Sequence, residues 1–184
     1  MTLIYQLSPT EEIKIRPPQL KDYIAYTQFI NSIAQESNPT HTNVIHHHTY
    51  TQKDKYKQIK NKISKIKKHK MIVLHAFNSQ NRLIAFVELY RSRHPRTSHM
   101  AELGIIIHQQ YRGLGLGSIM INQIIHQGKQ TIPAIKIIHL TTTITNQSAI
   151  KLYTKMGFKQ YGLLPNAVKY QDQFLDRILM FKNI

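Results

Sequence analysis

The sequence predicts a single α+β domain of mixed α/β order, and three observations carry that prediction. The chain has 184 residues, a length that suits one domain with a sizeable buried core. Stretches rich in Val, Ile, Leu and Phe alternate along it with stretches whose apolar residues recur at helical spacing. Neither an internal repeat nor a linker of domain-separating length interrupts this order. We therefore expect residues 1–184 to form one domain, with its core over about residues 11–182.

The first half of the chain predicts one strand, two helices and a hairpin. Ile13 and Ile15 alternate with charged residues before two prolines, which indicates a short strand that ends there. Apolar residues at helical spacing predict a first helix over about 19–36 and a second within 51–70. Residues 71–92 hold two apolar runs on either side of the turn-prone "NSQN", which is typical of a β-hairpin.

The second half predicts strands that are connected through helices. The expected elements are a strand at about 99–107, a helix at 116–127, a strand at 134–143, a helix at 146–156 and a final hairpin within 168–182. The complete order is β-α-α-β-β-β-α-β-α-β-β. Such an order gives a sheet that is antiparallel at first and then crosses over through helices.

The charge of the chain is strongly positive. Lys and Arg number 25 against nine Asp and Glu, a formal net charge of +16, and the isoelectric point is near 10.1. Residues 51–70 alone carry nine lysines and one aspartate. We interpret them as the solvated face of an amphipathic helix, and weak polyanion binding through this helix is the alternative that stays open. The chain has no cysteine, which excludes disulfides, a thiolate nucleophile and a cysteine zinc site.

The sequence also bears on location and metal binding. The stretch "MTLIYQLSPTEE" has neither a basic region nor a long apolar run, so no signal peptide is visible. No apolar run approaches the ~20 residues of a membrane span, and we expect a cytoplasmic protein. The triplet His46–His48 invites a metal interpretation, but consecutive side chains rarely point to one centre and no carboxylate accompanies them at zinc-ligand spacing. No metal site is expected.

Three of the seven glycines stand within five residues of "HQQYRGLGLGSIMI" (108–121): Gly113, Gly115 and Gly117. They lie between an expected strand and an expected helix, where unpaired helical N–H groups can hold a phosphate and glycine allows close approach. The dinucleotide pattern needs glycine where Ser118 or Met120 stands, and no Gly-Lys-Ser/Thr occurs. The pattern that remains is Arg112-x-x-Gly115-x-Gly117.

These residues carry a family resemblance. "YRGLGLGS" resembles the coenzyme A pyrophosphate loop of the GNAT superfamily of N-acetyltransferases, whose pattern is Gln/Arg-x-x-Gly-x-Gly/Ala. "TNQSAIKLYTKMGF" is similar to that superfamily's following helix, and "AELGIIIHQQYRG" to its splayed fourth strand. "HPRTSHMAELGI" and "LLPNAVKYQDQFLDRILM" resemble, more weakly, the branch with small-molecule or amino-acid acceptors. The resemblance implies a mostly antiparallel sheet of six to seven strands, splayed between strands 4 and 5 and flanked by about four helices.

The resemblance also implies an activity. An acyltransferase of this superfamily moves an acetyl group from acetyl-CoA to a primary amine by direct attack, here that of a small molecule, with free amino acids among the candidates. Three alternatives stay open: acetylation of a protein N-terminus or lysine, a basic nucleic-acid or ribosome-binding module on the same fold, and coenzyme binding without catalysis. A homodimer is compatible with the sequence.

By resemblance, the coenzyme site can be assigned to particular residues. Backbone N–H groups would hold the pyrophosphate at Arg112, Gly113, Leu114, Gly115, Leu116, Gly117 and Ser118. The backbone of Ile105 and Ile107 would bond the pantetheine and the acetyl carbonyl where the strand splays. Asn146 would cap a helix and reach the pantetheine arm. Tyr153 stands where the family carries the tyrosine that protonates the leaving thiolate.

Few carboxylates can serve as the base that deprotonates the amine. Glu88 and Glu102 each interrupt an apolar strand, and apolar surroundings raise the pKa of a carboxyl group toward the working range of a base. Glu102 matches the position of the family's proposed base, Glu88 is second, and catalysis without a protein base stays open. Asp22 fits the first turn of a helix. The remaining candidates are expected to be solubilising residues: Glu11, Glu12, Glu36 and Asp54.

Overall fold

The computed structural model describes residues 2–36, 48–170 and 172–184. The strands are β1 (Leu3–Ser8), β2 (Glu11–Arg16), β3 (Met71–Phe77), β4 (Leu83–Arg91), β5 (Met100–Ile107), β6 (Ile137–Thr143), β7 (Lys159–Tyr170) and β8 (Gln173–Asn183). The helices are α1 (Tyr23–Ala34), α2 (Gln52–Lys67), α3 (Leu116–Thr131) and α4 (Gln147–Lys155). The strands of this part of the chain form one mixed sheet in the order β1-β2-β3-β4-β5-β6-β8-β7, which confirms the α+β class.

The sheet has eight strands in the described residues, against the six to seven expected, and the additional strand is β1. β1 pairs antiparallel with β2, with Tyr5 opposite Ile13. Leu3, Tyr5 and Leu7 turn toward the main core while Ile4 stays exposed, so the strand is only half-buried at the sheet edge.

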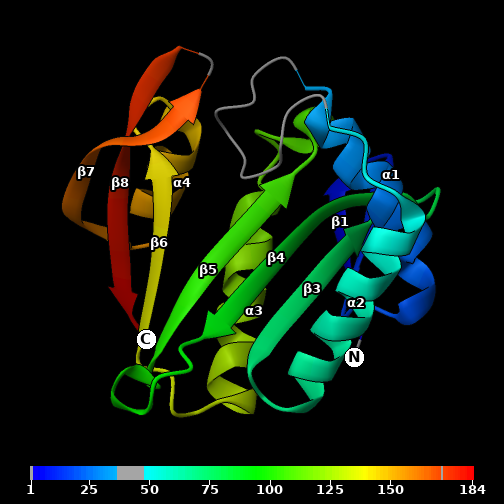
Figure 1. The fold of residues 1–184 in the computed structure, drawn as a ribbon. Helices are drawn as coiled ribbons and strands as arrows, with labels where there is room; N and C mark the ends of the chain where they lie inside the picture. Colours follow the sequence, from blue (N-terminus) through cyan, green and yellow to red (C-terminus); the bar gives the residue numbers. More distant parts are fainter. Residues whose placement is uncertain (1, 37–47, 171) are drawn as a thin grey trace.

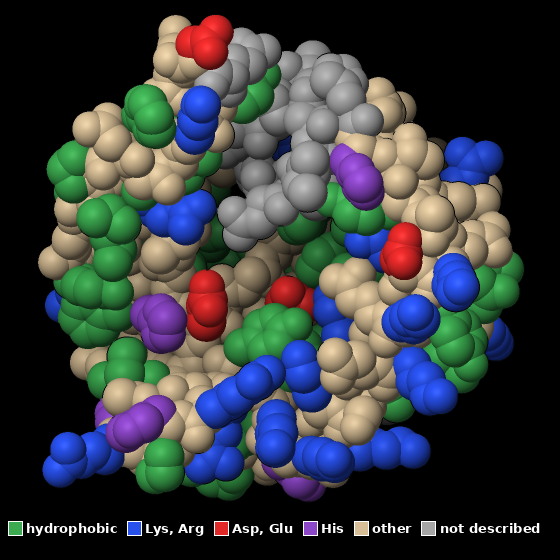
Figure 2. All heavy atoms as spheres, in the orientation of Figure 1, with side chains coloured by type: hydrophobic (Ala, Val, Ile, Leu, Met, Phe, Trp, Pro, Cys, Tyr) green, Lys and Arg blue, Asp and Glu red, His purple; other side chains and the backbone are tan. Residues whose placement is uncertain are grey.

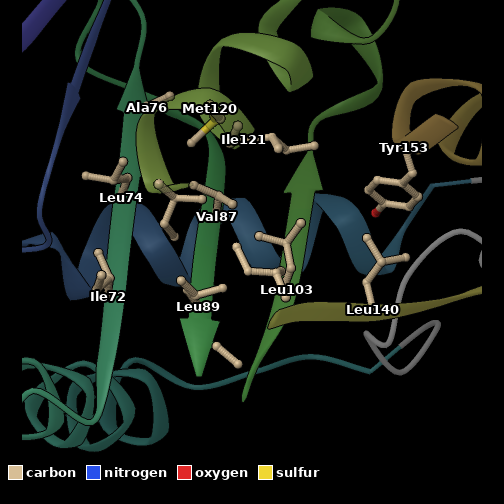
Figure 3. Close-up of a cluster of buried hydrophobic side chains, with 14 of the residues drawn as sticks. Ile72, Leu74, Ala76, Val87, Leu89, Leu103, Met120, Ile121, Leu140 and Tyr153 are labelled. Atoms are coloured by element: carbon tan, nitrogen blue, oxygen red, sulfur yellow. The ribbon is translucent and has the colours of Figure 1, made fainter. Parts of the chain in front are cut away.

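Helices cover both faces of the sheet (Figure 1). On one face, α3 and α4 pack against a core that Figure 3 shows in part, with Leu74, Val87, Leu103 and Met120 among its members. On the other face, α1 and α2 pack over β3 and β4 around a second cluster that includes Phe86. Each fully buried Ile, Leu or Phe of these clusters contributes about 1.5–3 kcal/mol through the hydrophobic effect. The alternation of side chains along the strands therefore gives the sheet two buried faces, and residues of both faces belong to the site described below.

The middle of the sheet splits open between β5 and β6 (Figure 1). These two strands are parallel and pair only as far as Glu102 and His139. Beyond that point β5 stays with β4 up to Ile107, and β6 stays with β8 up to Thr143. The carboxyl ends of two neighbouring parallel strands thus diverge, which confirms the expected splay. Ligands of open α/β sheets bind at such crevices.

Candidate functional site

The glycine loop, which contains Gly113, Gly115 and Gly117, runs from the carboxyl end of β5 into the first turn of α3 and exposes backbone N–H groups. Gly113 and Gly115 have φ angles of 77° and 85°, which L side chains rarely adopt, and Gly115 is the N-cap of α3. The main-chain bond that follows this cap runs from Ile119 N–H to the Gly115 carbonyl, at 3.3 Å. The N–H groups of residues 116–118 therefore lie at the positive end of a helix dipole, where an anion binds favourably.

Gly117 serves a different purpose from the two glycines before it. A Cβ at position 117 would lie 2.7 Å from Cδ2 of Leu152 on α4 and 3.4 Å from Cδ1 of Ile107. At Gly113 and Gly115 nothing lies within 4 Å of such an atom in the described residues. Gly117 therefore lets α3 and α4 approach each other closely, while the first two glycines give the loop its shape.

Arg112 is held by a buried carboxylate at the end of α1. Its Nη2 lies 2.5 Å from Oε2 of Glu36, and its Nε donates to the carbonyl of Ile107 at 2.9 Å. The other oxygen of Glu36 accepts from the N–H of Gln109 at 3.0 Å. Glu36 is 5% exposed, so the expectation that it is a solubilising residue is wrong. Glu36 instead attaches the glycine loop to the end of α1.

We expect Glu36→Gln to loosen this attachment. The substitution keeps the shape of the side chain but removes the charge, so the free energy of unfolding should fall by about 1.5 kcal/mol, the low end for a hydrogen bond to a charged group. Urea denaturation measures this difference. Glu12→Gln is the matched control, because the Glu12 side chain is 45% exposed and its replacement should change stability by less than about 0.5 kcal/mol. Equal losses in both variants would contradict the anchoring role.

The backbone of β5 turns alternate residues toward the splay. His108 N–H donates to the Ile84 carbonyl on β4, and the Met100 carbonyl accepts from Ser92, both at 2.9 Å. Even-numbered residues of β5 thus bond to β4, so the backbone groups of Ile105 and Ile107 point the other way. The carbonyl of Ile107 already accepts from Arg112, which leaves the two N–H groups facing the opening.

α4 borders the splay from the other side. Asn146 caps this helix, since its Oδ1 accepts from Ala149 N–H at 3.2 Å. Tyr153 packs edge-on against Phe158 and is 7% exposed. Figure 3 shows its ring directed inward toward Leu140. Burial raises the pKa of Tyr153 to about 12.

The side chain of Glu102 lies on the face of the sheet opposite to α3 and α4. It pairs with Tyr90 on β4 and with His139 on β6, at the point where the splay begins. These residues line an open cavity of about 430 Å³ together with Arg91 and Arg93. The apolar surroundings expected for Glu102 are not found, because the side chain is exposed among polar and charged neighbours.

Glu88 lies on the same face as Glu102 but forms a buried ion pair. Its Oε2 is 2.7 Å from Nζ of Lys62 on α2, and the same ammonium group donates to the hydroxyl of Tyr26 at 3.1 Å. Burial lowers the pKa of Lys62, but Tyr26 and Glu88 raise it by more, so the net shift is upward. The carboxylate of Glu88 is therefore already engaged by a cation.

A second open cavity, of about 510 Å³, adjoins this ion pair. Its floor is formed by Phe86 and Glu88 of β4 and Ile106 of β5, and its walls by α1 and α2. Figure 2 shows acidic side chains recessed in the hollow of this face, with Lys and Arg along the rim. Lys55 and Lys62 line the cavity and are 6% and 4% exposed, so the interpretation of α2 as a fully solvated lysine face is wrong at these two positions.

The described residues hold no group of three or more His, Cys, Asp or Glu side chains that could bind a metal ion. His46 and His47 of the sequence triplet lie outside the described residues, and His48 lines the second cavity. Among the helices that the structure describes, none combines the length and apolarity that a bilayer crossing requires.

Comparison with known proteins agrees with this geometry. The sequence profile described as "Acetyltransferase (GNAT) family" matches residues 30–158, more than half of the chain. The chain belongs to the GNAT acetyltransferase family. The match includes β5, the glycine loop, α3 and α4, which are the elements that surround the splay.

Solved structures share the fold of this GNAT chain. An acetyltransferase of the GNAT family from Streptococcus pneumoniae is 25% identical and aligns over 94% of this chain and 99% of its own, with a TM-score of 0.81. Phosphinothricin acetyltransferase from Sinorhizobium meliloti, solved in complex with AcCoA, is 15% identical over 94% of this chain and 88% of its own, with a TM-score of 0.76.

One curated relative is named for its activity on amino acids. The L-amino acid N-acetyltransferase AaaT of Escherichia coli (strain K12) is 28% identical over 86 residues, which are 47% of this chain and 52% of the relative. The chain thus matches about half the length of that protein.

The structure brings together most of the residues that the GNAT resemblance singled out. The glycine loop follows Ile105 and Ile107 of β5, Asn146 caps α4 and Tyr153 lies within it, and α3 meets α4 where Gly117 faces Leu152. Glu102 and Glu88 lie on the other face of the same strands. Sequence reasoning missed Glu36 and the buried lysines of α2. A signal for the lysines was present, because positions 55, 59, 62 and 66 recur at the spacing of one helical face.

Proposed function

We propose that this GNAT chain is an acetyl-CoA-dependent N-acetyltransferase whose acceptor is the primary amine of a small molecule, with free amino acids as the favoured class. The observation that carries the proposal is the β5–β6 splay with a helix N-terminus and an exposed glycine loop at its mouth. Acetyl-CoA in the S. meliloti neighbour and the L-amino acid activity named for the E. coli relative support it.

The residues present fit a pyrophosphate and a pantetheine arm. The backbone N–H groups of residues 116–118 lie at the dipole end of α3, and Gly113 and Gly115 leave open space on the loop before it. The side chain of Arg112 is committed to Glu36, so we assign the pyrophosphate chiefly to main-chain donors. Ile105 and Ile107 offer N–H groups to the arm, and Asn146 borders it.

When bound, acetyl-CoA supplies the activated acetyl group, and the chain's residues orient it and move protons. Glu102, exposed at the start of the splay, accepts the amine proton directly or through water, with Glu88 second because Lys62 already occupies it. Tyr153 has a pKa of about 12, so full transfer of its proton to a thiolate of pKa ~8.5 would cost about 5 kcal/mol. We therefore assign Tyr153 a hydrogen bond to the leaving sulfur.

Thermal unfolding with acetyl-CoA, CoA and NADH tests the coenzyme site. Either CoA species at 100 times its dissociation constant should stabilise the protein by about 2.7 kcal/mol, and NADH should not. Leu114→Asp places a negative charge on the exposed loop beside the expected pyrophosphate and should abolish most of the shift, whereas Leu114→Asn, of similar shape and neutral, should lose much less.

Thiol release with amino acids, amino-acid amides and short peptides as acceptors then tests the acceptor class. Turnover of peptides alone would favour a protein N-terminus as the acceptor. If neither CoA species shifted the unfolding temperature, the loop would not be a coenzyme site, and polyanion binding by the exposed lysines of α2 would become the leading function.

A further inference from the structure

Two buried lysines of α2 face the cavity above β4 and β5. Lys55 and Lys62 are seven residues apart, which is close to two helical turns, so they project from the same side of the helix. Both line the cavity of about 510 Å³ whose floor includes Ile106 of β5. Ile106 lies between Ile105 and Ile107, the residues assigned to the pantetheine and the acetyl group. The cavity therefore adjoins the place where the acetyl group would be transferred.

The charge of Lys62 is balanced within the protein. Its ammonium group has the carboxylate of Glu88 at 2.7 Å and the hydroxyl of Tyr26 at 3.1 Å. Its Nζ also lies 4.7 Å from the ring centroid of Phe86. A buried cation with a carboxylate and a hydroxyl as partners does not require a further ligand.

No carboxylate of the described residues forms an ion pair with Lys55, and the adjacent Asp54 offsets its charge only in part. All nine Asp and Glu residues of the chain lie in the described part, and none forms an ion pair with it. Its Nζ donates to Oε1 of Gln58 at 3.1 Å and lies 3.7 Å from the ring centroid of Tyr50. The adjacent Asp54 is bonded by the hydroxyl of Thr51 at 2.6 Å.

Burying an ammonium group without a counter-anion is unfavourable. Burial and repulsion from Lys62 lower the pKa of Lys55 by more than Asp54 raises it, and the result is a pKa of about 8. An anion that entered the cavity would gain a charge-assisted hydrogen bond and remove this penalty. A cationic acceptor such as a polyamine would instead meet two ammonium groups.

We propose that Lys55 binds the carboxylate of the acceptor, and that the acceptor is therefore an amino acid with a free carboxylate. In this arrangement the carboxylate lies against α2 and the amine points down to β5, where the acetyl group is transferred. The inference rests on the proposed function and adds to it the residue that sets acceptor specificity.

The test compares the best free amino acid with its carboxamide, which keeps the amine and loses the negative charge. In the unaltered protein the KM of the carboxamide should exceed that of the acid at least tenfold. Lys55→Met should raise the KM of the acid about 10- to 100-fold, with kcat and the KM of the carboxamide within about threefold. Lys55→Arg should restore part of the discrimination, and Lys57→Met, at an exposed position on the same helix, should change nothing.

A second measurement does not depend on turnover. The N-acetylated amino acid, which carries the carboxylate but no reactive amine, should raise the unfolding temperature of the unaltered protein and of Lys57→Met but not of Lys55→Met. If Lys55→Met kept the acid-to-amide ratio or the shift by the N-acetylated compound, the inference would be overturned while the acetyltransferase function stood. Absence of turnover together with a Lys55-dependent shift would instead overturn the function and keep the carboxylate site.

Discussion

Glu88→Ala is expected to lower the free energy of unfolding by about 3 kcal/mol. The substitution leaves the ammonium group of Lys62 buried without its carboxylate, and removal of one partner of a buried pair costs about 3–5 kcal/mol. We take the low end of this range because the Glu88 side chain is 18% exposed to solvent. Urea denaturation at neutral pH measures the loss. A change below about 1 kcal/mol would mean that water in the cavity screens the pair.

The double variant Glu88→Leu/Lys62→Met is the control for this prediction. It replaces both charges by apolar groups of similar size, which is often neutral or stabilising, so most of the lost stability should return. The stability that the Lys62–Glu88 ion pair provides should also depend on pH. The pKa of Lys62 is raised in the folded protein, so its contribution is fully present below the pKa of an unfolded lysine, ~10.4, and is lost as the pH rises through the higher folded value.

The fold was largely predictable because its signals are local. Helical periodicity located α1 to α4, and alternation or apolar runs located β2 to β6 and β8. The final hairpin expected within 168–182 missed most of β7, which begins at Lys159, because most of its side chains are exposed and no apolar run marks it. The sequence did not predict β1 because it is a half-buried edge strand. Ile4 is exposed, so the contrast in hydrophobicity between the two sides of the strand is weak. α3 continues to Thr131 rather than ending near residue 127, since its interior glycine, Gly128, packs against Leu89 without breaking the helix.

The parts of the site that sequence could not predict depend on contacts between distant residues. The glycine loop lies in one short motif, so its position between β5 and α3 followed from the sequence. Arg112 and Glu36 are 76 positions apart, and Lys62 and Glu88 are 26 apart, and no local pattern pairs them. The buried pair explains why Glu88, which alternation places on the same face as Glu102, differs from it in environment.

Glu102→Gln is expected to lower kcat about 100-fold at saturating acceptor, the low end for loss of a general base. A stopped or continuous assay of thiol release measures kcat. Glutamine is chosen because it keeps the size of the glutamate side chain. Because Glu102 is exposed, the substitution should leave the free energy of unfolding within about 0.5 kcal/mol, so the loss of rate can be read as chemistry. A kcat within twofold of the unaltered enzyme would show that catalysis proceeds without this base.

The size of the Glu102 effect should also depend on the acceptor, and this dependence separates a base from an orienting group. An α-amine with a pKa of about 8 is partly neutral at cellular pH, whereas a lysine-like amine near 10.4 must lose its proton first. If Glu102 removes that proton, the fall in kcat should be larger for the more basic amine and should shrink as the pH rises. If Glu102 only positions the acceptor, through its neighbours Tyr90 and His139, both amines should lose the same factor at every pH.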